Sequence, residues 1–336
     1  MSMSDGGEKV GILYWGSRGG GKILTDQLIM EAKRQNLEVI NFSRPYKKNS
    51  DREFISIWLF RRWLKARKEV ITDSVKSQID VMIIPMASPW DIFLGKRLIR
   101  VGIKVTRIIH DAKPHPGDTF PPKFWIRALC NDSSRVVALS KYVSEELSLL
   151  RYLEKTEIRV GKLPYPEIIP NVPFNNNLPR RNFLFIGRGR AYKGLDLLLT
   201  SWPLVGDANF ILTIAGEGHV VDKDIPRIRH IDRWLTDSEV LSLIANSDVI
   251  VLPYLEASQS GIIPTSLSSG RPIVITPVGG LVEQIEDGIN GVVSKGIDPY
   301  SLAEALNRAA TQEFSFRPKV DIWQSSTNLL NLCKTS

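Results

Sequence analysis

The sequence contains little cysteine and no long apolar run. Two of its 336 residues are cysteines, Cys130 and Cys333, and they lie far apart without the short spacing of a metal site. This usage excludes a disulfide-stapled scaffold and fits a reducing compartment. No apolar run approaches the ~20 residues of a membrane-spanning helix. Residues 1–9 are polar and carry both signs of charge, so we expect no signal peptide and a cytoplasmic protein.

Acidic residues are scarce in the first half of the chain. Residues 1–170 contain 29 Lys and Arg against 19 Asp and Glu, whereas residues 171–336 contain 15 against 17. The net charge of +8 therefore comes from the first half, which we expect to face an anionic partner. Nucleic acid and an anionic membrane both qualify. No aromatic platform or recognised reading motif accompanies the charge, so we predict no nucleic-acid partner.

Continuous apolar runs that stop at Gly or Pro organise the second half, at 183–186, 212–215, 249–252 and 273–275. Such runs are typical of strands buried on both faces of a parallel sheet. Helical periodicity lies between them at 195–199 and 238–245, so the pattern predicts a doubly wound α/β domain. Further strands are predicted in the first half, at 10–14, 38–42, 81–85, 104–109 and 158–160.

The loops after the predicted strands are suited to a diphosphate. Arg188 and Lys193 bracket a Gly-containing turn that leads into a helix. A helix amino end offers unpaired N–H groups, and the two cations supply further counter-charge. The pair Gly279 and Gly280 lets the backbone approach oxyanions closely, because no Cβ intervenes.

These pieces follow one another in a recognisable order. They are Gly187-Arg188-x5-Gly194 with Lys193 inside it, Ala215-Gly216-Glu217-Gly218, 247–253, 270–274 and Gly279-Gly280 followed by 287–291. In that order they resemble the nucleotide-sugar half of family 4 retaining glycosyltransferases (glycosyltransferase group 1), which have the GT-B fold. The resemblance implies an α/β protein of two doubly wound, Rossmann-like domains facing across a cleft. We expect an acceptor-side domain at 1–165, a nucleotide-sugar domain at 180–312 and a closing helix within 313–336.

The resemblance also assigns residues. His110, at the end of a predicted strand, would contact the transferred sugar, although a histidine there is more often a satisfied polar residue. Gly20 and Gly21 belong to a Gly-rich loop that would lie near the donor phosphate. The loop nearly matches the P-loop motif that binds nucleotide triphosphates, but Ile23 replaces the hydroxyl residue that binds magnesium. The remaining predicted donor contacts are Gly187, Gly216, Gly218, Trp234, Leu235, Ser260, Gly261, Thr265, Gly279 and Gly280.

One part of the family pattern is missing. The family often has two glutamates eight residues apart, and an ungapped match places Ala257 and Thr265 at those positions. Thr265 could replace a hydrogen-bond acceptor for ribose only in part. Glu256 lies one position before the first glutamate, and we predict that it contacts the sugar. The run 256–264 resembles a variant bacterial branch of the family.

Residues 54–68 combine Trp58 and Trp63 with five cations among their last eight residues. Such a helix could lie in a membrane interface with its cations on anionic lipid, or its apolar side could simply be core. The charge of the first half favours docking, which would place the protein peripherally on the inner face of the membrane.

We therefore expect a retaining, metal-independent hexosyltransferase with catalytic residues His110, Arg188, Lys193 and Glu256. Its donor would be a UDP- or GDP-sugar and its acceptor a saccharide or lipid-linked saccharide, in surface polysaccharide biosynthesis. The pair Asp222 and Asp224 lies in a polar loop and is interpreted as solvated. Two alternatives remain: an idle nucleotide-sugar-binding protein, and a sugar-nucleotide epimerase or hydrolase on the same fold.

Overall fold

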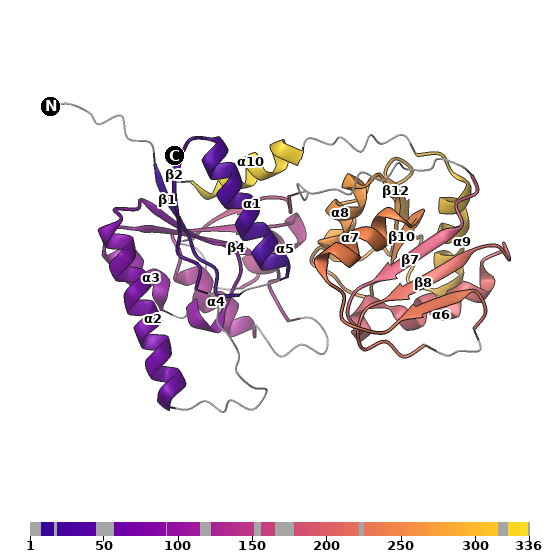
Figure 1. The fold of residues 1–336 in the computed structure, drawn as a ribbon, viewed down its shortest axis with the longest axis horizontal. Helices are drawn as coiled ribbons and strands as arrows, with labels where there is room; N and C mark the ends of the chain where they lie inside the picture. The colour runs from indigo at the N-terminus through magenta and orange to yellow at the C-terminus, as the bar shows by residue number, and fades with distance from the viewer. Residues whose placement is uncertain are drawn as a thin grey trace. The chain divides into compact units, whose positions relative to one another are not determined.

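The computed structural model describes residues 8–16, 19–44, 57–91, 93–114, 122–150, 156–164, 178–221, 225–314 and 322–334. Of the positions discussed above, His115, Asp222, Asp224, the first residues of the segment 54–68, the side chain of Trp58 and most of the predicted linker lie outside the described residues. The chain divides into two compact units (Figure 1). The first contains Met1–Pro114, Phe120–Pro164 and Trp323–Ser336, and the second contains Tyr165–Ile322.

The first unit is built on a six-stranded parallel sheet with the order β2-β1-β3-β4-β5-β6. Its strands are β1 (Lys9–Ile12), β2 (Glu38–Asn41), β3 (Val81–Ile84), β4 (Lys104–Ile109), β5 (Arg135–Ala138) and β6 (Glu157–Val160). Its helices are α1 (Gly20–Arg34), α2 (Ile57–Lys76), α3 (Leu94–Arg100), α4 (Lys123–Asn131) and α5 (Lys141–Ser148), with a short 3-10 turn η1 (Pro89–Asp91). Every residue of β3 is buried, as expected for a strand covered on both faces.

The second unit has a parallel sheet with the order β12-β11-β10-β7-β8-β9. Its strands are β7 (Asn182–Ile186), β8 (Ile211–Ala215), β9 (Ile228–Ile231), β10 (Val249–Leu252), β11 (Ile273–Ile275) and β12 (Gly291–Val293). Its helices are α6 (Leu195–Ser201), α7 (Asp237–Ala245), α8 (Ile262–Ser268) and α9 (Pro299–Thr311), with 3-10 turns η2 (Ala191–Lys193), η3 (Trp202–Leu204) and η4 (Gly279–Leu281).

Side chains of β7 alternate between the two cores of this unit. Phe183 and Phe185 pack on the side of α6 and α9, whereas Leu184 and Ile186 pack with residues of α7 and α8. Successive side chains of a strand point to opposite faces, so a strand between two helix layers must be apolar throughout. The doubly wound prediction is confirmed in both units.

The last described helix, α10 (Ile322–Cys333), belongs to the first unit. Leu329, Leu330 and Cys333 enter the core beneath β1 and β3. The Thr106 hydroxyl of β4 donates to the Cys333 carbonyl at 2.9 Å. Burial raises the pKa of the Cys333 thiol to about 12, so this cysteine acts as a small apolar side chain.

The structure corrects the expected start of the first helix. The sequence predicts that Gly20 and Gly21 lie in a Gly-rich loop, but α1 begins at Gly20, with Gly19 at φ 77° as its N-cap. Gly20 and Gly21 are therefore helical rather than part of an open loop. The Tyr14 ring lies against Gly21, where a Cβ would come within 2.7 Å of it. Packing against Tyr14 thus outweighs the low helix propensity of glycine.

Candidate functional site

The second sheet changes direction at β7. From β7 the chain builds outward to β8 and β9 on one side, and it then returns to place β10 on the other side. In doubly wound sheets ligands bind at such a switch point, beyond the carboxyl ends of the strands. The loops concerned are those after β7 and β10, and they contain Arg188, Lys193 and Glu256.

The loops after β7 and β8 are joined by backbone hydrogen bonds. The Gly187 N–H donates to the Ala215 carbonyl at 3.0 Å, and the Gly189 N–H to the Glu217 carbonyl at 2.8 Å. A Cβ on Gly216 would lie 1.9 Å from the Gly187 carbonyl oxygen. Gly187 and Gly216 also have φ values of 145° and 134°, which L side chains rarely adopt. Glycine at these positions is required by both contact and conformation.

Lys193 lies in the space that Gly187 leaves. A Cβ on Gly187 would come within 2.3 Å of the Lys193 ammonium nitrogen. That nitrogen also lies 5.3 Å from the centre of the Tyr254 ring, which follows β10. The Leu255 N–H donates to the Tyr192 carbonyl at 2.7 Å, so the loops after β7 and β10 are joined by backbone. Lys193 is therefore positioned at the switch point, whereas Arg188 is exposed in the same loop.

The loops after β10 and β11 are also bonded together. The Gly280 N–H donates to the carbonyl of Ala257, which is buried, at 3.0 Å. Ser260 exchanges hydrogen bonds with the Gln284 amide, through its N–H at 2.8 Å and its carbonyl at 3.3 Å. Gly279 and Gly280 lie in η4, and Glu256 is half-buried in the loop before Ala257.

Thr265 lies in the first turns of α8, after Gly261, the N-cap of that helix. Its hydroxyl donates to the Gly261 carbonyl at 3.0 Å. The hydroxyl proton is used within the helix, while the oxygen lone pairs are still acceptors. Thr265 therefore offers one acceptor oxygen where a glutamate would offer two.

His219 belongs to this site and was not predicted from the sequence. Its Nε2 lies 2.6 Å from the Gly187 carbonyl oxygen, and because a carbonyl only accepts, Nε2 carries the proton. The buried ring packs edge-on against Phe185, with centroids 5.3 Å apart. Burial lowers the pKa of His219, the hydrogen bond to the Gly187 carbonyl opposes this shift, and the nearby Lys193 ammonium adds to it. A neutral imidazole thus holds the Gly187 carbonyl from the β8 side.

The segment after β9 contributes to the same edge of the sheet. The Asp232 carboxylate accepts from the Gly218 N–H at 2.8 Å, which ties this segment to the β8 loop. Trp234 is 51% exposed, and Leu235 packs against the α7 and α8 side of the core. Thr236 caps α7 in a capping box with Glu239.

Of the predicted site residues, His110, Gly20 and Gly21 belong to the first unit. His110 follows β4, and its Nε2 donates to the Pro85 carbonyl at 3.0 Å. Burial lowers the pKa of His110, so the ring is neutral near pH 7 and Nδ1 is its acceptor nitrogen. The other predicted residues lie in the second unit, on the loops described above, apart from Thr265 in α8.

The part of the chain that contains this site is similar to known proteins. Residues 180–312 match the family model described as glycosyl transferases group 1. An uncharacterized glycosyltransferase of Methanocaldococcus jannaschii, MJ1178, is 24% identical over 192 residues, which is 55% of this chain and 52% of that protein. The chain spans about half the length of the curated relatives it matches.

Solved structures match over nearly the whole chain. Anabaena HepE in complex with UDP-glucose is similar with a TM-score of 0.62 at 13% identity, covering 97% of this chain and 95% of that one. WaaG, a glycosyltransferase involved in lipopolysaccharide biosynthesis, gives a TM-score of 0.63 at 14% identity, covering 97% and 100%. At these identities the likeness establishes the fold. Residues 180–312 are thus similar to the group 1 glycosyltransferases, and the chain has the GT-B fold.

Proposed function

We propose that this protein is a retaining hexosyltransferase that moves a sugar from a UDP- or GDP-sugar to a saccharide or lipid-linked saccharide. The expected context is surface polysaccharide biosynthesis. The family match of residues 180–312 supports glycosyl transfer. HepE, whose structure contains UDP-glucose, and WaaG of lipopolysaccharide biosynthesis have the same fold and support the donor class and the context.

The observation that carries the proposal is the position of Lys193 at the switch point. It lies in the space left by Gly187, beside the interlocked β7 and β8 loops. When the bond from the anomeric carbon to the diphosphate oxygen breaks, negative charge grows on the leaving group. Lys193, positioned at the switch point, and the exposed Arg188 of the same loop stabilise that charge, which lowers the barrier.

The proton balance requires no strong protein base. As the acceptor oxygen bonds to the anomeric carbon, its proton passes to an oxygen of the leaving diphosphate. In this proposal His110 and Glu256 contact the sugar hydroxyls. A neutral His110 can accept a hydrogen bond at Nδ1 while Nε2 remains bonded to the Pro85 carbonyl. Transfer without a metal ion is part of the same proposal, since the two cations supply the counter-charge.

A second candidate is a nucleotide-sugar-binding protein without transferase activity. Ala257 is buried, with its carbonyl bonded to Gly280, and it offers no carboxylate. Thr265 offers one acceptor oxygen in place of two. These two positions weaken the sugar half of the site and leave the phosphate half intact.

The test is a titration of the purified protein with UDP, GDP, ADP and dTDP and their sugar conjugates, followed by thermal stability. At a ligand concentration 100 times Kd, binding stabilises the fold by about 2.7 kcal/mol. Lys193→Ala should abolish most of this shift and lower kcat about 100-fold, because one fixed cation is lost. Lys295→Ala is the matched control, since that lysine is exposed in the same unit and pairs with Glu304.

The outcomes are distinct. A selective shift together with transfer of the sugar supports the proposal, whereas a shift without turnover supports the binding protein. Wild-type binding and turnover in Lys193→Ala would contradict the site assignment.

A further inference from the structure

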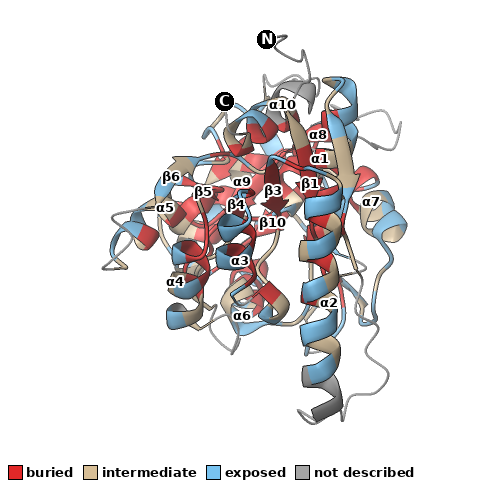
Figure 2. Cartoon of the chain, turned by 90° about the vertical axis from the view of Figure 1, so that its left-hand side faces the viewer, coloured by how far each residue is buried: buried red, intermediate tan, exposed pale blue. Residues whose placement is uncertain are grey.

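The positive charge of the first half of the chain is concentrated on three helices. Helices α2, α3 and α4 together contain eleven Lys and Arg residues and two acidic residues. Their net charge of +9 accounts for nearly all of the net +10 of residues 1–170. Figure 2 shows that the outward sides of these helices are exposed. Such a concentration of one sign indicates an anionic partner.

Exposed cations run along the outer side of α2. Arg61, Lys65, Lys68 and Lys76 are exposed at helical spacing, while Arg67, Val70 and Ser74 are buried on the opposite side. Residues three and four apart share one face of a helix, so these cations form a stripe. The stripe faces away from the sheet.

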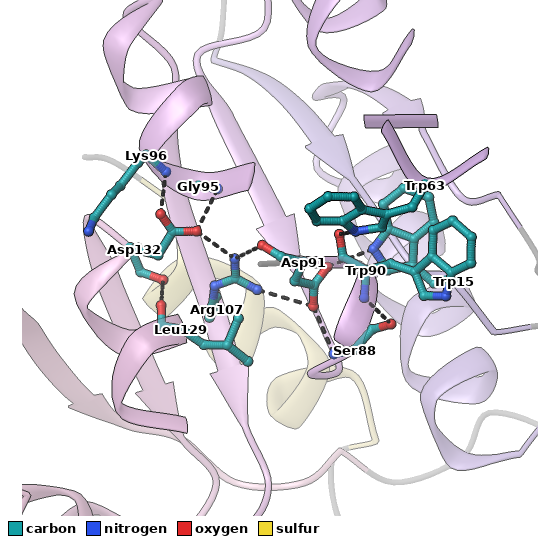
Figure 3. A network of polar contacts seen from close by, with 11 residues as sticks. Trp15, Trp63, Ser88, Trp90, Asp91, Gly95, Lys96, Arg107, Leu129 and Asp132 are labelled. Atoms are coloured by element: carbon teal, nitrogen blue, oxygen red, sulfur yellow. Dashed lines mark hydrogen bonds and ion pairs between the residues drawn. The ribbon is translucent and has the colours of Figure 1, made fainter. Parts of the chain in front are cut away.

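Trp63 does not serve this outer face, which corrects the role expected from its sequence position. Its indole N–H donates to the Trp90 carbonyl at 3.3 Å, and the buried Arg67 guanidinium lies 4.2 Å from its ring centre. Trp63 is therefore part of the contact between α2 and η1 (Figure 3). Any aromatic side chain of this surface that enters lipid must therefore lie outside the contact between α2 and η1.

Two exposed phenylalanines occur beside a cavity between α3 and α4. Phe93 is 60% exposed and Phe124 is 71% exposed. With Lys96 and Arg127 they line a cavity of about 370 Å³, whose wall includes the buried Asp132. Phe93 has φ 56°, a conformation that costs energy for a bulky residue and that clusters at functional positions.

The base of this surface is rigid. Asp132, after α4, accepts from the N–H groups of Gly95 and Lys96 at 2.8 and 2.6 Å, and so caps α3 (Figure 3). Arg107 of β4 lies between Asp132 and Asp91. The carboxylate of Asp132 is therefore neutralised inside the fold, and the cavity presents its cations and aromatic rings outward.

We propose that the outer faces of α2, α3 and α4 dock on an anionic lipid bilayer. Phe93 and Phe124 enter the boundary between headgroups and acyl chains, and the cations lie on headgroup phosphates. Aromatic rings flanked by Lys and Arg are the composition that binds this interface. The proposal is independent of the donor site, since its residues belong to the first unit.

The experiment is cosedimentation of the full chain with phosphatidylcholine vesicles, with and without phosphatidylglycerol. Binding is expected only with the anionic lipid and should weaken as salt is raised. Lys65→Gln with Lys68→Gln and Lys96→Gln should weaken binding about 100-fold, because each cation near the surface contributes separately. The matched control replaces three exposed lysines on other elements, at positions 33, 141 and 162, by Gln.

The aromatic part is tested by Phe93→Gly with Phe124→Ser. Glycine suits the backbone at φ 56°, so this variant should fold at least as stably as the wild type at that position. Vesicle binding should fall about tenfold or more, through lost apolar contact. Tyr300→Ser, at a residue that is 76% exposed in the other unit, is the control.

Nucleotide-induced stabilisation should be unchanged in all of these variants, which separates this proposal from the proposed function. Equal vesicle binding by the variants and their controls would overturn the docking surface. Binding to RNA without binding to vesicles would overturn it as well.

Discussion

Replacing Arg107 by Met removes the cation at the centre of the buried network shown in Figure 3. Arg107 is 1% exposed, Asp91 is fully buried and Asp132 is 2% exposed. An Arg107 Nη1 lies 3.2 Å from an Asp91 carboxylate oxygen, and Nη2 lies 3.5 Å from one of Asp132. The substitution leaves two buried carboxylates without their counter-charge.

The expected loss of unfolding free energy depends on the hydrogen bonds that the two carboxylates keep. Asp91 keeps hydrogen bonds from the Trp15 indole at 2.6 Å and the Ser88 N–H at 2.8 Å. Asp132 keeps the two N–H groups of α3. Hydrogen bonds moderate the penalty but do not cancel the charge, so we expect a loss of about 3–5 kcal/mol, as for other broken buried ion pairs. Domains are commonly stable by about 5–15 kcal/mol, so this is a large fraction.

The loss should depend on pH with a defined sign. Burial raises the pKa values of Asp91 and Asp132 even in the wild type, where Arg107 opposes the effect. Without Arg107 they rise further. A carboxyl whose folded pKa exceeds the unfolded value of about 3.9 binds more protons when folded, so the native state gains as pH falls through the raised pKa. The deficit should therefore be larger at about pH 8 than at about pH 5.

The assay is urea unfolding of both proteins at the two pH values, followed by tryptophan fluorescence. The quantity compared is the difference between variant and wild type, which cancels the titration of groups that both proteins share. Arg97→Met, at an exposed residue of α3, is the control and should cost little. A deficit for Arg107→Met below about 1 kcal/mol, or one that does not change with pH, would refute the reasoning.

Two further predictions concern the proposed donor site. Gly216→Ala should destabilise the second unit by about 2 kcal/mol or more and weaken nucleotide binding, because φ 134° and a 1.9 Å approach to the Gly187 oxygen exclude a Cβ; unchanged urea unfolding and affinity would contradict it. His219→Phe keeps the packing on Phe185 but leaves the Gly187 carbonyl without its donor, at a cost of about 1–3 kcal/mol. The pKa of His219 is lower in the folded chain than in the unfolded chain, so the unfolded chain binds more protons as the pH falls. Wild-type stability should therefore decrease below about pH 6.5. His219→Phe should lose stability less steeply on acidification, and parallel pH profiles of urea unfolding would contradict this.

Strands in the middle of each sheet could be predicted because they are covered on both sides. β4 is observed at 104–109, where the apolar run predicts it, and β7 and β10 lie within one residue of their predicted positions. β9 was not predicted, because Arg229 and His230 interrupt this edge strand and leave it without an apolar run. An edge strand needs no apolar run, so the signal is missing from the sequence.

Helix ends were harder to predict, because their causes lie outside the helix. The start of α1 at Gly20 depends on the Tyr14 ring that packs against Gly21. α2 continues to Lys76, beyond the predicted end at residue 68, because Val70 and Ser74 are buried on its inner side. The cluster of cations at 61–68 therefore does not mark the end of the helix, because the buried side of α2 continues beyond it.

Some residues of the candidate site could be predicted from the sequence, and His219 could not. Gly187, Gly216 and Lys193 are visible because each loop follows a recognisable strand, and each glycine has a steric reason. His219 gives no such signal, since its role depends on the pairing of β7 with β8, which the sequence does not specify.

The same arrangement separates two tasks within the second unit. The loops after β7 and β8 hold Lys193, Gly187 and Gly216 through contacts that do not involve the altered glutamate positions. Ala257 and Thr265 lie instead in the β10 loop and in α8, and in the proposed function these are the positions that face the sugar and the ribose. In the proposed function, a chain with these substitutions could bind the sugar more weakly and still bind the diphosphate. For this reason nucleotide binding alone does not prove transfer, and the product of turnover is the measurement that distinguishes the enzyme from a binding protein.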